Sequence, residues 1–324
     1  MSNAIQLTLA VGEATGRPVD GASPVSLAEA AAIAAVAAEV GVAAIRLVDG
    51  GAGRTLDPTV VGAYLAGIHG GVGFVAEVPT THNAPYNAAR RVLSLDRAAG
   101  GRTGVALRAG GGDEVSEATV AASNATDAAQ RWAEYALVLT RLWESFPRAA
   151  LIGDQESGLV ADDALIEPIN HEAAFYRVAG PLDGPSSAQG RPVLVADLGA
   201  LDPTAVARSA DVVVVDRERV AGADAALTAA LRRAGRSRED VALLGRVEVA
   251  ADDPAAAAAV GHELRAWADA HRLDGFELVP AGGAEDVVTV LRGLVPQLAD
   301  AAADSPPPTL RAAFGLRVVA EALR

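Results

Sequence analysis

Two short apolar runs and the helical stretch between them indicate how this chain folds. Residues 43–51 read AAIRLVDGG, and residues 72–78 read VGFVAEV. The stretch between them begins at Asp57-Pro58, a typical helix N-cap followed by a proline in the first turn. Strands that are apolar along their whole length and alternate with helices indicate a parallel sheet buried on both faces. The segment therefore predicts two neighbouring parallel strands joined by a helix.

The same alternation extends along the chain in both directions. It predicts eight strands, at residues 5–11, 43–48, 72–78, 103–107, 192–195, 212–215, 241–247 and 276–279. A helical stretch follows each strand, at residues 26–40, from 57 onward, and at 85–98, 127–146, 203–208, 223–234, 254–271 and 284–301. Eight such units are typical of the (β/α)8 TIM barrel, which is the predicted α/β fold. An open, doubly wound parallel sheet is the alternative.

Two segments do not follow this rhythm. Residues 147–190 are rich in Gly, Pro, Asp and Ser and too long for an ordinary connection, so they are interpreted as an insertion between the fourth helix and the fifth strand. Residues 305–308 form a proline-rich linker to a predicted helix at 310–323, and residues 305–324 make a C-terminal extension. We expect residues 1–324 to form one barrel domain.

Composition excludes several classes of function. Hydrophobic residues make up 51 % of the chain, which is enough for a large core. There is no cysteine, and all 27 basic residues are arginine, so disulfides, thiolate metal sites and lysine Schiff bases are excluded. The net charge of −14 would repel a nucleic-acid backbone. No apolar run is long enough to span a bilayer and no signal peptide is recognisable, so we expect a cytoplasmic protein that binds neither nucleic acid nor membrane.

In a barrel of this type, the residues just past the strand ends surround the working site. Asp49 ends the second strand at a Gly-Gly turn, where it either bonds its own backbone or anchors a bound ring or sugar. Thr80, Thr81 and His82 follow the third strand and supply two hydroxyls and an imidazole. We expect this cluster to contact a cofactor or substrate, with His82 as an acid or base.

The other histidines point to structural roles, and no metal site is expected. His69 and His262 fall on predicted helices, and His271 falls at a helix C-terminus, where its charge would favour the dipole. His171 lies in the insertion and could either cover the pocket or anchor the loop. No zinc or calcium spacing is present.

Two segments resemble a known family. Residues 79–91 read PTTHNAPYNAARR and continue through SLD at 94–96 to GGR at 100–102. Residues 169–172 read INHE, and the stretch from 180 to 192 contains GPL and QGRP. Together these motifs resemble the luciferase-like flavin-dependent monooxygenases, and within them a shortened, divergent member of the nitrilotriacetate monooxygenase branch.

The resemblance implies a barrel that binds reduced FMN at its strand mouths. The flavin would come from a separate reductase and would act with O2 on a small organic substrate. Asp49, Thr80 and Thr81 match positions that line the flavin pocket in that family. The resemblance also implies a homodimer.

The chain departs from the branch where the flavin phosphate binds. The branch carries a Gly-Ser/Ala-Ser-x-x-Gly loop after the fifth strand, whereas residues 198–203 read LGALDP. A phosphate there would meet Asp197 and Asp202 instead of hydroxyl groups. After the fourth strand the branch has Gly-Trp-Asn, whereas residues 104–106 read GVA. Two alternatives therefore stand beside the monooxygenase: a non-catalytic barrel that has lost FMN and acts as a binding or partner subunit, and a barrel that uses a deazaflavin or no cofactor.

Overall fold

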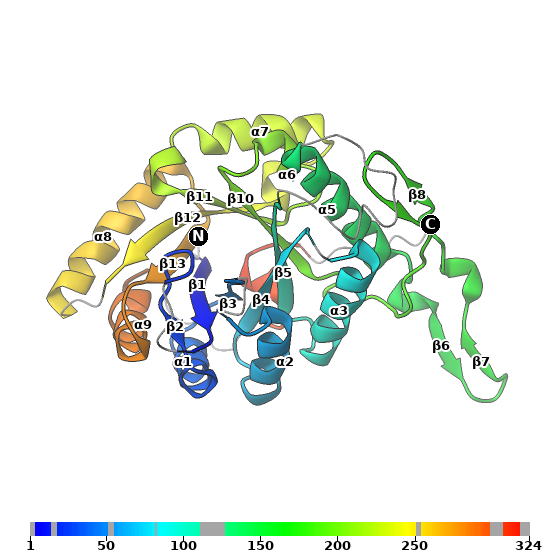
Figure 1. Cartoon of the computed structure of the whole chain (residues 1–324), viewed down its shortest axis with the longest axis horizontal. Helices are drawn as coiled ribbons and strands as arrows, with labels where there is room; N and C mark the ends of the chain where they lie inside the picture. Colours follow the sequence, from blue (N-terminus) through cyan, green and yellow to red (C-terminus); the bar gives the residue numbers. More distant parts are fainter. Residues whose placement is uncertain are drawn as a thin grey trace.

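The computed structural model is a closed barrel of eight parallel strands surrounded by helices (Figure 1). It describes residues 4–13, 18–50, 55–81, 83–110, 127–250, 254–298 and 307–317. The barrel strands are β1 (Ala4–Val11), β3 (Ala44–Leu47), β4 (Gly73–Pro79), β5 (Thr103–Arg108), β10 (Val193–Leu198), β11 (Val212–Asp216), β12 (Ala242–Val249) and β13 (Gly275–Pro280). These are the eight predicted strands, with ends that differ by at most a few residues.

Pairing between the first and last strands closes the ring and rules out the open sheet. β1 and β13 pair in parallel from Ala4 opposite Gly275 to Leu7 opposite Leu278. Gly275 is required at this junction, because a Cβ there would lie 1.9 Å from the carbonyl oxygen of Ala4. A two-residue strand, β2 (Pro24–Val25), pairs in parallel with the far end of β1.

Several helices begin at polar N-caps, and one of these is the predicted cap Asp57. Ser26 caps α1 and forms a capping box with Glu29, Asp57 caps α2, and Asp127 caps α5. The helices are α1 (Leu27–Glu39), α2 (Pro58–Ile68), α3 (Pro85–Ala98), α5 (Ala128–Glu144), α6 (Pro203–Val206), α7 (Ala223–Arg233), α8 (Pro254–His271), α9 (Ala284–Leu298) and α10 (Leu310–Ala313). None of the described helices is long and apolar enough to cross a membrane.

The insertion between α5 and β10 contains two small antiparallel hairpins. One pairs β6 (Leu151–Asp154) with β7 (Leu159–Ala161), and the other pairs β8 (His171–Glu172) with β9 (Arg177–Val178). The first hairpin projects from the body of the molecule beyond α3 (Figure 1). Short 3-10 turns lie at Arg148–Ala150, Asp163–Leu165, Arg217–Arg219 and Arg238–Asp240.

The C-terminal segment closes the barrel at the N-terminal ends of the strands. Leu310, Phe314 and Leu316 pack against inward-facing residues such as Val75 and Val195. The prediction of a helix over residues 310–323 was too long, because α10 ends at Ala313 and residues 318–324 are outside the described part. Because described apolar side chains fill this end, the opposite mouth is where we expect a ligand to bind.

Candidate functional site

The predicted residues Asp49, Thr80 and Thr81 lie on one part of the C-terminal rim. Asp49 follows β3 and the two threonines follow β4, and these strands are neighbours in the sheet. The Asp49 backbone is fixed from both sides: its N–H donates to Glu77 Oε1 at 3.3 Å, and its carbonyl accepts from Arg108 at 2.8 Å. His82 lies outside the described residues.

The two threonines hold the segment that follows β5. The Thr80 side chain is buried, and its Oγ1 accepts a hydrogen bond from the Gly110 N–H at 3.2 Å. A Cβ at Gly110 would lie 2.2 Å from the Thr81 methyl group, so the segment after β4 contacts the segment after β5 here. Thr80 therefore shapes the rim through Gly110, and Thr81 lies half-buried at its edge.

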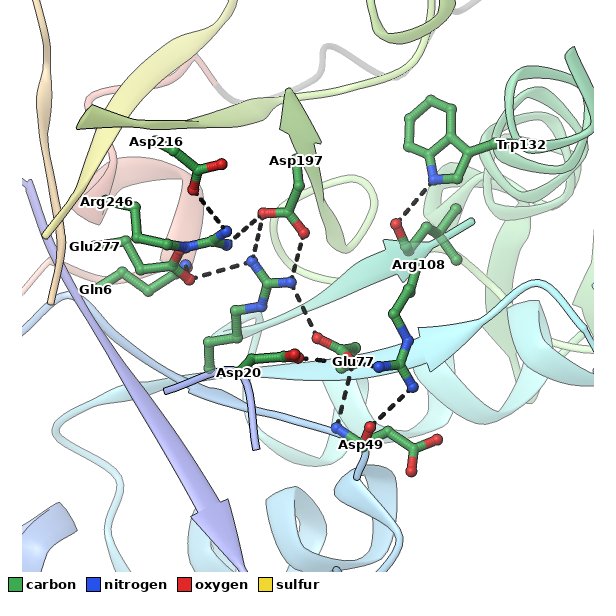
Figure 2. A network of polar contacts seen from close by, with 12 residues as sticks. Gln6, Asp20, Asp49, Glu77, Arg108, Trp132, Asp197, Asp216, Arg246 and Glu277 are labelled. Atoms are coloured by element: carbon green, nitrogen blue, oxygen red, sulfur yellow. Dashed lines mark hydrogen bonds and ion pairs between the residues drawn. The ribbon is translucent and has the colours of Figure 1, made fainter. Parts of the chain in front are cut away.

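Below the rim, a network of ion pairs fills the barrel interior (Figure 2). Arg46 on β3 donates two hydrogen bonds to the Asp197 carboxylate on β10, at 2.8 and 2.7 Å. The same guanidinium reaches Glu77 on β4 at 3.0 Å and Glu277 on β13 at 3.2 Å. The buried Arg46 side chain thus connects β3 with β4, β10 and β13 across the interior of the ring.

A second arginine extends the network to the remaining side of the barrel. Arg246 on β12 contacts Glu277 at 2.6 Å, Asp197 at 2.6 Å and Asp216 on β11 at 3.1 Å. The Gln6 amide on β1 donates to Glu277 at 2.9 Å. Burial alone would raise the pKa of Asp197, but Arg46 and Arg246 hold it well below its usual range.

A third arginine links the network to the rim. Arg108, at the end of β5, lies 3.3 Å from Glu77 and 3.9 Å from Asp20, and its side chain is 38 % exposed. Burial raises the pKa of Glu77, and the charges of Arg46 and Arg108 only partly offset this. Arg108 is therefore a cation that is held from below by a buried carboxylate and faces the mouth.

Sequence reasoning missed most of this network. Asp197 was considered only as an acid near a bound phosphate, and Arg46, Glu77, Arg246 and Glu277 were not singled out. Part of the signal was available, because Arg46, Glu77 and Glu277 are each the one charged residue of an otherwise apolar strand. Arg246 shares β12 with a second charge, Glu248. A charge in a doubly buried strand needs a partner, and charges on four strands of one barrel can meet at its axis.

An open pocket of about 500 Å³ lies at the C-terminal ends of β10 and β11. It is lined by residues 198–203, by the start of α7 and by Arg219, which donates to the Gly199 carbonyl at 3.0 Å. The N-cap of α7 is Gly222, so no side chain of the cap accepts from the N–H groups of the first turn, which also contains Asp224.

The expected repulsion of a phosphate by Asp197 and Asp202 is wrong for the first of these residues. Asp197 is neutralised by two arginines inside the barrel. Asp202 does line the pocket, but its carboxylate accepts hydrogen bonds from Thr204 N and Ala205 N at the start of α6. Arg219 was not predicted, and it supplies a cation where the sequence suggested only acids.

The described histidines have structural surroundings. His171 is buried, and its Nε2 lies 3.0 Å from the Glu134 carboxylate, which also accepts from Tyr176 N at 2.8 Å. His171 therefore anchors the insertion to α5, one of the two roles predicted for it. His271 ends α8 and meets the Trp267 ring edge-on. Among the described residues, no group of three or more His, Cys, Asp or Glu could hold a metal ion.

Comparison with solved structures gives the same architecture over nearly the whole chain. The long-chain alkane monooxygenase LadA superposes with a TM-score of 0.79 at 16 % identity, covering 97 % of this chain and 95 % of that one. The EDTA monooxygenase EmoA from Chelativorans sp. BNC1 gives 0.76 at 19 % identity and covers 98 % of each chain. The riboflavin lyase RcaE, solved with modified FMN and riboflavin, gives 0.80 at 18 % identity, covering 98 % of this chain and 97 % of its own.

Sequence comparison identifies relatives that match part of the chain. Nitrilotriacetate monooxygenase component A of Aminobacter aminovorans is 30 % identical over 210 residues, which is 60 % of this chain and 45 % of the relative. Dibenzothiophene-sulfone monooxygenase of Rhodococcus erythropolis is 32 % identical over 149 residues, 45 % of this chain and 33 % of the relative. The chain thus covers about half or less of the length of these curated relatives. Residues 8–303 match the family model described as luciferase-like monooxygenase. The chain belongs to the luciferase-like monooxygenase family.

Proposed function

We propose that this protein is an FMN-dependent monooxygenase that uses reduced flavin from a separate reductase, together with O2, on a small organic substrate. The observation that carries the proposal is the pocket of about 500 Å³ at the ends of β10 and β11, with Arg219 and the N-terminus of α7 in its wall. This volume lies within the usual range for cofactor and ligand sites. A guanidinium and a helix N-terminus are the groups that bind a phosphate.

We place the flavin ring on the part of the mouth that lies beside that phosphate site. The strands follow one another in the order β3, β4, β5, β10, β11, so their ends form one continuous arc. With the phosphate at Arg219, the ring would lie toward Asp49, Thr80 and Thr81, the three residues assigned to flavin binding. The arginine and helix end replace the serine-rich loop of the nitrilotriacetate branch, which residues 198–203 lack.

The bound flavin would supply the electrons that activate oxygen, and the protein would position the reactants and exclude water. Arg108 would hold a positive charge at the rim, where its guanidinium already bonds the Asp49 carbonyl. The Arg46 network beneath it would close the barrel floor with fixed charges. His82 is proposed as the acid or base that moves protons at the substrate.

The names of the relatives indicate a broad class of substrate and no single compound. Their names specify a nitrilotriacetate, an EDTA, a dibenzothiophene-sulfone and a long-chain alkane monooxygenase, so the family members that match this chain act on different small organic molecules. We propose a small organic substrate that enters at the same mouth.

Titration of the purified protein with FMN, followed by flavin fluorescence, tests the proposal. We expect saturable binding in the micromolar range and weaker binding of riboflavin, which lacks the phosphate. No binding of FMN at millimolar concentration would reject the proposal and favour the non-catalytic barrel. Binding of a deazaflavin cofactor in preference to FMN would instead favour the deazaflavin alternative. Formation of an oxygenated product from candidate substrates, with photoreduced FMN and O2, then tests the activity itself.

A further inference from the structure

Three arginines gather near the N-terminal ends of the strands, on the side of the barrel opposite the mouth. Arg191 lies two residues before β10, and Arg311 lies on α10 in the C-terminal segment. Arg236 lies in the connection between α7 and β12. Each of the three is close enough to Asp211, which directly precedes β11, for their charges to interact. The cluster is separate from the interior network and from the proposed flavin site.

One buried carboxylate in this cluster is shared by two buried guanidinium groups. Arg191 Nη2 donates to Asp211 Oδ1 at 2.9 Å, and Arg311 Nη2 lies 2.7 Å from Asp211 Oδ2. The exposed fraction of the side chain is 10 % for Arg191, 4 % for Arg311 and 1 % for Asp211. A buried charge needs a partner of opposite sign, and here one negative charge serves two positive ones.

The other carboxylates near the cluster lie toward solvent. Glu144 lies 3.2 Å from Arg191 Nε, but its side chain is 52 % exposed. Asp240 is half-buried, and its carboxylate accepts from the Ser237 N–H in a capping box. Water and dissolved salt weaken the charge of such groups, so they replace a second buried anion only in part.

Arg236 adds a third positive charge beside the buried pair. Its guanidinium donates to backbone carbonyls, which neutralise no charge, at Ala207, Ala210 and Asp240. Burial lowers the pKa of both Arg191 and Arg236, and the neighbouring guanidinium groups lower it further. The nearby carboxylates offset only part of this effect. The cluster is therefore short of negative charge.

Arg191 also has a buried hydrogen-bond donor that the described residues leave unused. Its Nη1 atom is buried and has no acceptor among them. A buried N–H group without an acceptor costs free energy, so a further acceptor beside Nη1 would stabilise the protein. A water molecule would accept the hydrogen bond but would leave the excess positive charge. A small anion would accept the bond and balance the charge together.

We propose that Arg191 and its neighbours bind a small monovalent inorganic anion, such as chloride. One negative charge matches a carboxylate that is shared by two guanidinium groups, whereas Asp211 repels a multiply charged oxyanion more strongly. The bound anion stabilises the contact between the C-terminal segment, which carries Arg311, and the start of β10. This site takes only an ion, and the mouth remains the place for an organic ligand.

Thermal unfolding at constant ionic strength tests the binding, with sodium gluconate replaced stepwise by sodium chloride. Arg191→Met removes one guanidinium and leaves Asp211 paired with Arg311, so this variant should not respond to chloride specifically. Relative to it, the wild-type melting temperature should rise and level off after about 2–4 °C, the shift at roughly ten times the dissociation constant. Arg232→Met, at an exposed site on α7, is the control and should keep the wild-type response. A wild type that responds to chloride no more than Arg191→Met would overturn the proposal.

Anomalous diffraction locates the anion in the wild type and needs no variant to fold. Bromide replaces chloride at halide sites and scatters anomalously near its absorption edge, whereas water does not. We expect crystals grown with sodium bromide to show an anomalous peak in contact with Arg191 Nη1. Density there without an anomalous signal would indicate a water molecule and reject the proposal. Neither experiment requires bound flavin, so both outcomes are independent of the proposed activity.

Discussion

Arg46 and Asp197 face each other across the barrel and form a two-pronged ion pair, with both guanidinium ends 2.7 to 2.8 Å from the carboxylate oxygens. They belong to β3 and β10, which are separated in the sheet by β4 and β5. The pair therefore ties together strands that share no backbone hydrogen bonds. It also neutralises Asp197, which directly precedes the 198–203 segment that lines the proposed cofactor site.

Asp197→Asn should destabilise the protein strongly. The change leaves the Arg46 and Arg246 guanidinium groups buried with one carboxylate fewer, and a broken buried ion pair costs about 3–5 kcal/mol. Urea unfolding followed by circular dichroism measures the change in unfolding free energy. Asp202→Asn is the matched control, because asparagine caps a helix as well as aspartate does, and it should cost less than about 1 kcal/mol. Equal effects of the two substitutions would contradict the role of the network.

The stabilisation by Asp197 should be lost in acid. Its pKa is lower in the folded protein than in the unfolded chain, where it is about 3.9. The ionised group therefore stabilises the fold fully above that value, and the contribution disappears as the pH falls toward the lower, folded pKa. We expect the difference in unfolding free energy between wild type and Asp197→Asn to be constant from pH 5 to 7 and to shrink below about pH 4. A difference that stays constant to pH 2.5 would argue against this ionisation.

The fold could be predicted from sequence because its signals are local. Apolar runs such as residues 72–78 and caps such as Asp57 and Asp127 depend on neighbours in the chain, and the structure places a strand or helix boundary at each. A charge inside an apolar strand indicates that it has a buried partner, but no local pattern specifies which strands face one another and therefore which charges pair. The sequence around Arg46 therefore does not identify its partners, which lie on other strands of the closed ring.

The candidate site was predicted only in part for the same reason. Asp49 and Thr80 do reach one rim, since neighbouring strand ends must meet there. Arg219 lies in the 3-10 turn that follows β11. Nothing in the sequence around it indicates that its side chain donates to the Gly199 carbonyl. Only the positions of β10 and β11 in space reveal that contact.

Arg219→Ala should weaken FMN binding by about ten- to a hundredfold, because it removes one charge-assisted contact to the phosphate. Riboflavin, which has no phosphate, should bind the variant and the wild type within about twofold of each other. Fluorescence titration with both ligands measures the two constants. Arg232→Ala, at the other end of α7, is the control for a lost positive charge. If riboflavin binding fell as much as FMN binding, Arg219 would have a structural role and no phosphate contact.

Thr81→Ala should weaken flavin binding about two- to tenfold, the range expected for one neutral hydrogen bond. Thr81 lies half-buried at the rim and touches Gly110, and under the proposed function its hydroxyl would contact the flavin. Thr81→Ser keeps the hydroxyl and should retain most of the affinity. The affinities of both variants for FMN are measured by fluorescence. Unchanged affinity in Thr81→Ala would remove this residue from the proposed flavin pocket.

Gly275→Ala and Gly293→Ala should have opposite effects on stability, although the substitution is the same. At Gly275 the new methyl group would lie 1.9 Å from the Ala4 carbonyl oxygen, so β1 and β13 would have to separate where the barrel closes. At Gly293, in the interior of α9, the nearest atom is the Ala257 Cβ at 3.5 Å, an ordinary contact. Alanine there should stabilise the helix by about 0.5–1 kcal/mol. We expect Gly275→Ala to unfold at lower urea concentration than wild type, or to fail to fold, and Gly293→Ala to unfold at higher concentration. If Gly275→Ala unfolded at the same urea concentration as wild type, the β1–β13 pairing would not be what holds the ring closed. The geometry of the mouth depends on that pairing.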